Sequence, residues 1–520
     1  MIPVQNKRTN QMSETLEKPK AIVTDAEPPT PGPQAEPVIY ELSAPGRRGY
    51  SLPPLDVPVE AETSALLPGV PRRDELLLPE VNELEVVRHF VRLSQRNYAI
   101  DVGFYPLGSC TMKYNPKINE EVVRLPGWQE LHPLQSDEEC QGALALLYRL
   151  ERLLCEIGGM DRATLQPAAG AQGEMTGLLI ARAYFRHRGE IGREVVIVPD
   201  SSHGTNPATA SRCGFRTVSI ASNARGRVDL NILKRVVNEH TAVLMLTNPN
   251  TLGLFEEEIT EIARVVHQAG GLVYCDGANM NAILGRARPG DMGFDLMHFN
   301  LHKTFSTPHG GGGPGAGPVA VKAFLADYLP IPVVERVGEQ YRRRYRLPLS
   351  IGKVHSFSGN FGILARAYAY IRSNGAEGLR EISDVAVLNA NYLASLLADR
   401  FRFDYGTRCM HEFVLSARLQ RERGVSALDI GKRLMDYRFY PPTVYFPLIV
   451  KEAMMIEPTE TETPETLERF AAAMNQIDQQ SIDDPEIVRG APHFTPVGRL
   501  DETAAARRPD LVWGGMRDEG

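Results

Sequence analysis

The hexapeptide Asn300-Leu301-His302-Lys303-Thr304-Phe305 is the most informative segment of this chain. It places one lysine between a histidine and a hydroxyl residue, directly after a short apolar run and shortly before a glycine block at 310–313. This layout is typical of a lysine that a strand end presents to a ligand, as in lysines that bind pyridoxal 5′-phosphate (PLP) covalently. A lysine in a loop is more often a solvated surface charge, so the assignment of Lys303 depends on residues elsewhere in the chain.

Apolar runs of strand length alternate with helix-like runs through the middle of the chain, which predicts an α/β fold with a mostly parallel sheet. Parallel sheets of this kind bind ligands at the carboxyl ends of their strands. The expected strands are 195–198, 217–220, 243–246, 272–275, 296–299 and 318–321. The expected helices are 83–93, 138–157, 174–186, 230–239, 256–268, 362–372 and 379–401.

Composition and periodicity divide the chain into five segments. Residues 1–37 are polar and rich in proline, and we expect them to form a disordered extension. Residues 38–130 are expected to form an N-terminal arm and a helical segment. A large α/β domain that binds PLP is expected over 131–345, and a smaller C-terminal α/β domain over 346–485. A charged tail that contains proline follows over 486–520.

The overall composition excludes several classes of protein. A chain of 520 residues with 43% hydrophobic content can bury a large core and normally forms two or more domains. The net charge of −7 gives no support to nucleic-acid binding, and no apolar run reaches the length of a membrane span. The N-terminus lacks the apolar segment of a secretory signal, which favours a cytoplasmic location. The six cysteines show no CxxC pair or zinc-like spacing, so we expect reduced thiols and no metal site.

The segment 166–174, which contains Gly170, Ala171 and Gln172, opens one of the predicted helices. Small residues there leave backbone N–H groups exposed at a helix N-terminus, where the helix dipole favours a phosphate group. An ordinary junction between a loop and a helix has the same composition. This segment alone is therefore compatible with both interpretations.

Asp276 directly follows a predicted buried strand. A carboxylate there can pair with the protonated pyridine nitrogen of PLP and keep the ring cationic, so that the ring accepts electrons from a substrate carbanion. Ala278 is small enough to lie flat against such a ring. The alternative for Asp276 is a cap of a turn or helix, which is the commoner role of an aspartate at a strand end.

Two further turns follow predicted strands. His203, within Ser202-His203-Gly204, can stack on the ring face opposite Ala278, although a structural histidine in a turn is the simpler alternative. Thr247 and Asn248 precede a proline and can reach the phenolic oxygen of the ring. Asn-Pro sequences are also common in plain turns.

The order of these segments favours the cofactor. A phosphate loop, a ring-face histidine, an Asn-Pro turn, an Asp-x-Ala motif and a lysine follow one another, each at the end of a predicted strand. The separation of Asp276 and Lys303 leaves room for one further strand. Agreement by chance at all of these positions is rare, so we expect Lys303 to bind PLP covalently, with Thr304 beside it.

These segments together resemble the glycine cleavage system P-proteins, and within them subunit 2 of the two-subunit form, glycine dehydrogenase (aminomethyl-transferring, decarboxylating). The string Leu107-Gly108-Ser109-Cys110-Thr111-Met112-Lys113 and the hexapeptide that contains Lys303 are highly specific. Further matching motifs lie at 45–53, 166–178, 203–207, 247–251, 352–354, 359–362, 411–413 and 457–460. The resemblance covers about residues 38–475 and implies a PLP-dependent transferase of fold type I, in which a smaller domain closes over the cofactor. The N-terminal extension and the tail depart from it.

The resemblance also implies a reaction. It is the decarboxylation of glycine, with transfer of the aminomethyl group to the lipoyl arm of an H-protein and release of CO2. Lys303, His302 and Asp276 are the implied catalytic residues, with His302 either aiding proton transfer or lining the site. Ser109 and Thr111 are candidates for holding the glycine carboxylate or shaping a lipoyl channel. The implied partners are the H-protein and P-protein subunit 1, in an α2β2 heterotetramer.

Two alternatives remain open. Another fold-type I PLP enzyme, such as an amino-acid decarboxylase or a cysteine desulfurase, would share the cofactor residues, and Cys409 is the candidate for the mobile cysteine that a desulfurase needs. A non-catalytic scaffold subunit of related fold would lack a working cofactor site, whereas Lys303 and Asp276 are both present. Cys110 is expected to be a buried thiol. The basic run at 342–346 fits either a contact at the mouth of the site or a solvated helix face.

Overall fold

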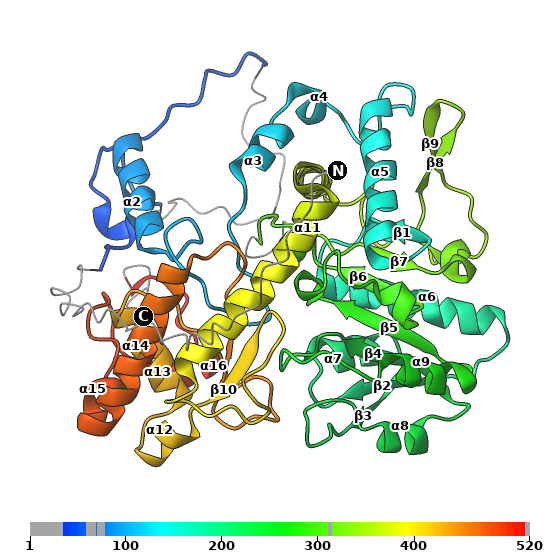
Figure 1. Ribbon diagram of the computed structural model, residues 1–520. Helices are drawn as coiled ribbons and strands as arrows, with labels where there is room; N and C mark the ends of the chain where they lie inside the picture. Colours follow the sequence, from blue (N-terminus) through cyan, green and yellow to red (C-terminus); the bar gives the residue numbers. More distant parts are fainter. Residues whose placement is uncertain (1–34, 59–68, 70–77, 310–314, 515–520) are drawn as a thin grey trace, which may run out of the picture.

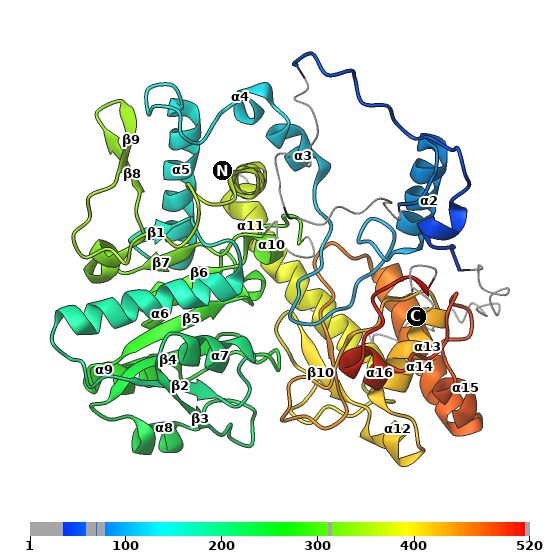
Figure 2. The same cartoon turned by 180° about the vertical axis from the view of Figure 1, so that it is seen from behind.

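The computed structural model describes residues 35–58, 69, 78–309 and 315–514 (Figure 1; Figure 2). The strands of its largest sheet are β1 (Arg162–Thr164), β2 (Val195–Pro199), β3 (Arg216–Ile220), β4 (Thr241–Thr247), β5 (Leu272–Gly277), β6 (Leu296–Phe299) and β7 (Val319–Val321). They lie in the order β1-β7-β6-β5-β4-β2-β3. Strands β3, β2, β4, β5 and β6 are parallel, and β7 runs antiparallel to both of its neighbours. The six expected strands are confirmed, and the short strand β1 was missed.

Helices cover both faces of this sheet. They are α5 (Gln141–Gly158), α6 (Gly170–His187), α7 (Thr205–Arg212), α8 (Leu230–Val236), α9 (Ile259–Gln268), α10 (Leu301–Thr304) and α11 (Phe361–Leu397). Along β5, Tyr274 packs on the side of α6 and α7, whereas Cys275 packs on the side of α5, α9 and α11. The central strands are therefore buried on both faces, which explains why their sequences are continuously apolar.

Two glycines allow α6 to lie close to the sheet. A Cβ atom on Gly177 would lie 2.3 Å from the ring of Tyr274, and a Cβ atom on Gly173 would lie 2.8 Å from the carbonyl oxygen of Gly317. Both distances are far below van der Waals contact. Figure 2 shows α6 running across β5 and β6, with its N-terminus directed toward the centre of the molecule. The two glycines thus determine how close the N-terminus of α6 lies to the sheet.

The C-terminal part contains a second, antiparallel sheet of β10 (Phe413–Ser416), β12 (Ala453–Ile456) and β11 (Thr443–Val444), in that order. The helices around it are α12 (Arg418–Glu422), α13 (Ala427–Asp436), α14 (Pro464–Asp483), α15 (Pro485–Arg489) and α16 (Glu502–Arg507). The helices expected over 362–372 and 379–401 are joined in α11 across a kink at Gly375, where φ is 63°. The two halves of α11 belong to different apolar cores, so this helix connects the two sheets (Figure 1).

The N-terminal arm contains the 3₁₀ turn η1 (Ile39–Leu42), α2 (Glu83–Arg96), α3 (Lys117–Val123) and α4 (Pro126–Gln129). Helix α2 lies on the side of the smaller sheet, whereas α3 packs against α11 and Trp128 of α4 lies against Phe361 (Figure 1). The expected disorder over 1–37 falls almost entirely outside the described residues, as does the glycine block at 310–313. At the end of the extension, the Glu36 carboxylate accepts a hydrogen bond from Arg92 of α2 at 2.6 Å.

For the basic run at 342–346 two alternatives were open, a contact at the mouth of the site and a solvated helix face, and the helix face is wrong. Its residues begin in β9 (Gln340–Arg344), which forms a hairpin with β8 (Val333–Val337) beside α5. Gly338, with φ of 60°, makes the tight turn that the hairpin needs. Arg343 donates to Asp137 Oδ1 at 2.5 Å and to the Pro133 carbonyl at 2.9 Å. These arginines lie outside the cavity described below.

All six cysteines lie in the described part of the chain and are free thiols, as expected. Cys110 is partly exposed, and burial raises its pKa to about 11, so it is protonated at neutral pH. Within the described ranges, no helix combines the length and apolarity that crossing a bilayer requires.

The contact of α6 with the sheet predicts the effect of an added methyl group. Gly177→Ala should lower the free energy of unfolding by about 1–3 kcal/mol, because its Cβ atom meets the rigid ring of Tyr274. Gly142→Ala near the start of α5 is the control, since its Cβ atom meets no described atom within 4 Å. Thermal and urea unfolding should show a loss for the first variant and none for the second; equal effects would contradict the close packing of α6.

Candidate active site

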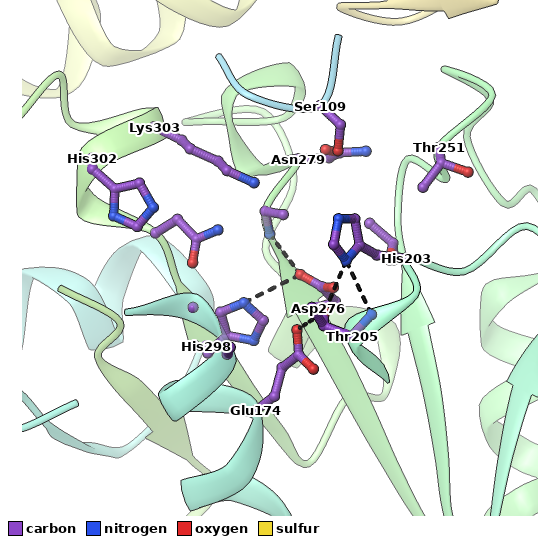
Figure 3. Close-up of a pocket in the computed structure, with 15 residues that line it drawn as sticks. Ser109, Glu174, His203, Thr205, Thr251, Asp276, Asn279, His298, His302 and Lys303 are labelled. Atoms are coloured by element: carbon purple, nitrogen blue, oxygen red, sulfur yellow. Dashed lines mark hydrogen bonds and ion pairs between the residues drawn. The ribbon is translucent and has the colours of Figure 1, made fainter. Parts of the chain in front are cut away.

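A cavity of about 160 Å³ lies at the carboxyl ends of the parallel strands (Figure 3). Its lining comes from the loops after β2 and β6, the ends of β4 and β5, the N-terminus of α6, and the loop that contains Ser109. The lining residues are Ser109, Gly170, Ala171, Glu174, His203, Thr205, Thr247, Thr251, Asp276, Ala278, Asn279, His298, Asn300, His302 and Lys303. Most of the residues singled out from the sequence therefore meet in one place.

Lys303 lies on α10, the single turn that follows β6, and its side chain points into the cavity (Figure 3). With the Asn300 amide oriented so that both of its polar groups are satisfied, its oxygen accepts a hydrogen bond from Lys303 Nζ at 3.2 Å. His302 also lines the cavity, and its ring lies edge-on to that of His309 with centroids 5.1 Å apart. Burial lowers the pKa of His302 to about 3, so this side chain is neutral at physiological pH.

The N-terminus of α6 opens onto the cavity. Gly170 and Ala171 line it, and the N-cap residue Ala169 has no side-chain acceptor for the first amides of the helix. These N–H groups and the helix dipole together suit an anion such as a phosphate group. A Cβ atom on Gly170 would lie 2.4 Å from the Asn300 side chain, so only glycine fits at this position.

Asp276 is a buried carboxylate with three hydrogen-bond donors. Oδ2 accepts from Asn206 Nδ2 at 3.1 Å, and Oδ1 accepts from the Ala278 amide at 3.0 Å. His298 Nε2, from the adjacent strand β6, lies 3.2 Å from Oδ1. Burial alone would raise the pKa of Asp276, but these donors and the Lys303 charge outweigh it and lower the pKa below its usual value. Asp276 is therefore ionised.

His298 is held in one tautomer. Burial lowers its pKa, so the ring is neutral. Its Nδ1 lies 2.8 Å from the hydroxyl of Tyr274, whose own pKa burial raises well above its usual value. The Tyr274 hydroxyl therefore donates to Nδ1, and the hydrogen of His298 is left on Nε2, where it points at Asp276.

Thr247 is the last residue of β4 and the neighbour of Asp276 in the sheet register. Its hydroxyl is buried and has no hydrogen-bond partner among the described residues, although it lines the cavity. His203 and Ala278 also line the cavity, as expected from the sequence. An unpartnered buried hydroxyl beside an open cavity is a feature that a bound ligand would satisfy.

Three residues assigned to the cofactor from the sequence have side chains outside the cavity lining. Gln172 Nε2 donates to the Val354 carbonyl at 2.5 Å. Asn248 Oδ1 accepts from the Glu256 amide at 2.9 Å. Thr304 is fully buried, and its hydroxyl has no partner among the described residues. The side chains of Gln172 and Asn248 therefore support the loops around the cavity.

The loop that contains Ser109 and Thr111 is held by two buried glutamates. The Ser109 amide donates to Glu412 Oε2 at 2.7 Å. The amide and hydroxyl of Thr111 donate to Glu457 at 2.9 and 2.6 Å. Both loop residues have positive φ, 64° and 49°, which non-glycine residues rarely adopt and which surrounding contacts must enforce. Ser109 lines the cavity, whereas the hydroxyl of Thr111 is turned toward Glu457.

The two glutamates are close together and fully buried. One atom from each of His411, Glu412 and Glu457 lies within 4.8 Å of the others. Burial raises the pKa of Glu457 to about 7 and, together with the neighbouring Glu457 charge, raises that of Glu412 well above its usual value. Burial lowers the pKa of His411 to about 3, so it supplies no positive charge. The pair therefore retains at least one proton at neutral pH.

Sequence reasoning missed several residues at this site. His298 sits inside an apolar run and looks like part of the core; the signal was a polar residue within a buried strand, next to Asp276 in register. Glu174 was quoted only as part of a helix start, and Asn206 only as part of a turn. Glu412 and Glu457 lay in motifs of the resemblance but received no role.

Comparisons with known proteins identify the fold and the family. Residues 173–312 match the class-V aminotransferase family, and residues 382–491 match the C-terminal domain of glycine dehydrogenase. Similar solved structures include a glycine decarboxylase (P-protein) of the glycine cleavage system in inhibitor-bound form, with a TM-score of 0.66, 20% identity, and 80% of this chain and 93% of that chain covered. A NifS-like protein has a TM-score of 0.55 at 16% identity, covering 72% and 99%. The chain thus has the fold of the fold-type I PLP-dependent enzymes.

Relatives of higher identity define the family. A probable glycine dehydrogenase (decarboxylating) subunit 2 of Caldanaerobacter subterraneus is 58% identical, with 92% of this chain and 98% of the relative covered. Proteins with the same description in Bacillus velezensis and Staphylococcus haemolyticus are 59% and 56% identical, covering 92% and 94% of this chain and 98% and 99% of the relatives. The chain belongs to the glycine dehydrogenase (decarboxylating) subunit 2 family of enzymes.

The buried Glu457 predicts a pH dependence of stability. Its pKa is about 7 in the folded chain against 4.5 normally. Below the lower value both states carry the proton, whereas between the two values only the unfolded state loses it, so stability falls as pH rises, by up to about 1.4 kcal/mol per pH unit. The thermal midpoint of Glu457→Gln, relative to wild type, should therefore increase from pH 5 to pH 8.

Glu422→Gln, at an exposed site, is the matched control for this measurement. The difference between its thermal midpoint and that of wild type should be the same at pH 5 and pH 8. If the difference in thermal midpoint between Glu457→Gln and wild type is also the same at both pH values, this result would contradict a proton retained on Glu457.

Proposed function

We propose that this chain uses PLP, held covalently by Lys303, to decarboxylate glycine and to transfer the aminomethyl group to the lipoyl arm of an H-protein. The observation that carries the proposal is one cavity that combines Lys303, the ionised Asp276 and the N-terminus of α6. In the overall reaction the bond between the glycine α-carbon and its carboxylate breaks and CO2 leaves. The α-carbon then bonds to one lipoyl sulfur, and the other sulfur becomes a thiol.

The residues of the cavity fit PLP. The N-terminus of α6 offers free amides to the phosphate group, and the ionised Asp276 can hold a proton on the ring nitrogen. The unpartnered hydroxyl of Thr247 can donate to the ring oxygen, and the small side chain of Ala278 leaves space for a flat ring. Bound PLP supplies an electron sink for the pair of electrons that CO2 leaves behind.

Ser109 is the better placed of the two substrate candidates. Its hydroxyl lies at the cavity, and the hydrogen bond from its amide to Glu412 holds its backbone in place. Thr111 commits both its amide and its hydroxyl to Glu457, so its part is to shape the loop. We therefore assign Ser109 to the carboxylate of glycine. The neutral His302 lines the Lys303 side of the site.

The partners follow from the family. The relatives are named subunit 2, which supports a complementary subunit 1, and an α2β2 assembly is the simplest arrangement. The H-protein is the expected aminomethyl acceptor, because its lipoyl disulfide is the oxidant that the overall reaction needs.

Lys303→Ala tests the cofactor linkage. The variant should lose the PLP that wild type retains after borohydride reduction and denaturation, and should not exchange labelled bicarbonate into glycine in the presence of H-protein. Lys451→Ala is the control, because this lysine is exposed and its interaction with Ser416 uses only its carbonyl group. Retained exchange in the Lys303 variant would contradict the assignment of Lys303 as the residue that holds PLP.

Asp276→Asn tests the charge beside the ring. The variant should still bind PLP through Lys303, but the exchange rate should fall by about 100-fold or more, because the ring nitrogen loses the anion that keeps it protonated. Asp327→Asn, at an exposed site, should leave the rate unchanged. An unchanged rate in the Asp276 variant would argue against electron withdrawal by a protonated ring.

A further inference from the structure

Glu174, in the second turn of α6, is a buried carboxyl group to which no role has been assigned above. It lines the cavity and is only 3% exposed. Its Oε1 lies 2.7 Å from the Thr205 hydroxyl, and its Oε2 is buried without a hydrogen-bond partner among the described residues. One atom from each of Glu174, Asp276 and His298 lies within 4.8 Å of the others.

Two carboxylates this close in a buried site do not both ionise. Asp276 has three donors and takes the negative charge, as described above. Burial, followed by the charge of Asp276, raises the pKa of Glu174 to about 7, and the side chains of Thr205, Asn206 and Thr209 offset this only in part. Glu174 is therefore the group that holds a proton. The titratable groups that face it are Asp276 and Tyr274 on β5, His298 on β6, His203 before α7, Cys213 at the end of α7, and Lys303 on α10.

The Thr205 hydroxyl connects Glu174 to His203. It lies 2.8 Å from His203 Nδ1 and 2.7 Å from Glu174 Oε1, in a chain that Figure 3 shows with dashed lines. A hydroxyl carries one hydrogen, so the chain runs in one direction or the other. With Glu174 protonated, the carboxyl donates to Thr205, and Thr205 donates to Nδ1. With Glu174 ionised, the Thr205 hydroxyl donates to the carboxylate instead, and Nδ1 loses this donor.

A third contact of Thr205 fixes the tautomer of His203. The backbone N–H of Thr205 also donates to His203 Nδ1, at 3.2 Å. This is compatible only with an Nδ1 that accepts, because two hydrogens would otherwise face each other. Desolvation lowers the pKa of His203 despite the neighbouring Asp276 charge, so the ring is neutral and its hydrogen is on Nε2.

We propose that Glu174 is a positioning residue which, through Thr205, holds His203 as the neutral ring with its hydrogen on Nε2. The ring then offers a donor at the end that lies away from Thr205 (Figure 3). Loss of the Glu174 proton turns the Thr205 hydroxyl toward the carboxylate, so that Nδ1 loses this donor and keeps the one from the Thr205 backbone N–H. The consequence for catalysis rests on the proposed function, in which His203 lies on the face of the cofactor ring.

The test measures the tautomer directly. Full-length chain labelled with ¹⁵N-histidine is titrated from pH 6 to pH 8, with and without PLP, and a His203→Asn variant identifies the His203 signals. Wild type should show the Nε2–H form at pH 6, and its Nδ1 signal should shift with a midpoint near 7, when the Thr205 hydrogen turns from Nδ1 to Glu174. Glu174→Gln should keep the pH 6 signals throughout, because its amide N–H can donate to Thr205 as the protonated carboxyl does.

Two further variants keep the proposal falsifiable if Glu174→Gln does not fold. Thr205→Val removes the hydroxyl and should abolish the pH step in the His203 signals, whereas Thr205→Ser should retain it. An Nδ1–H form in wild type at pH 6, an unchanged pH step in Glu174→Gln, or a pH step that survives in Thr205→Val would each overturn the proposal.

The outcomes separate this proposal from the proposed function. PLP uptake is read from visible absorbance in the same samples. A chain that shows the pH step but takes up no PLP overturns the proposed function and leaves the role of Glu174 intact. A chain that binds PLP without the step overturns only the role of Glu174.

Discussion

The arrangement of the site depends on one buried negative charge, that of Asp276. An ionised carboxylate away from water costs several kcal/mol unless donors surround it, and removal of a single partner leaves that cost uncompensated. Its donors come from different elements: Asn206 from α7, the Ala278 amide from the turn after β5, and His298 from β6. The charge therefore fixes where α7 begins relative to β5 and which residue of β6 faces β5.

A second constraint ties the smaller sheet to the cavity. Glu412 precedes β10 and Glu457 follows β12, so the ends of two strands of that sheet supply the carboxyl groups that hold the loop of Ser109 and Thr111. The same loop continues to the buried Lys113, which donates to the carbonyl of Thr304 at 2.8 Å, next to Lys303. A few short hydrogen bonds thus connect the smaller sheet to both the Ser109 side and the Lys303 side of the cavity.

Much of the fold could be predicted, because buried parallel strands and amphipathic helices leave strong periodic patterns. The six central strands, the start of α6 and the position of Lys303 after β6 all follow from such patterns. The helix-face alternative for 342–346 was wrong, because a two-stranded hairpin with arginines on both sides has no distinctive apolar period. His298 was missed because a polar residue inside an apolar run shows its role only when the neighbouring strand is placed beside it.

By itself, the sequence determined the fold class, the family and the positions of Asp276 and Lys303 at strand ends, since these depend on local patterns and on specific strings of residues. Only the tertiary structure decided which buried carboxyl groups keep a proton and which nitrogen of a histidine carries the hydrogen. The roles of Glu174, Glu412, Glu457 and Thr111 depend on distances between residues that are up to 346 positions apart. The physical reason is that burial and hydrogen bonding, which set a pKa and a tautomer, exist only once the chain has folded.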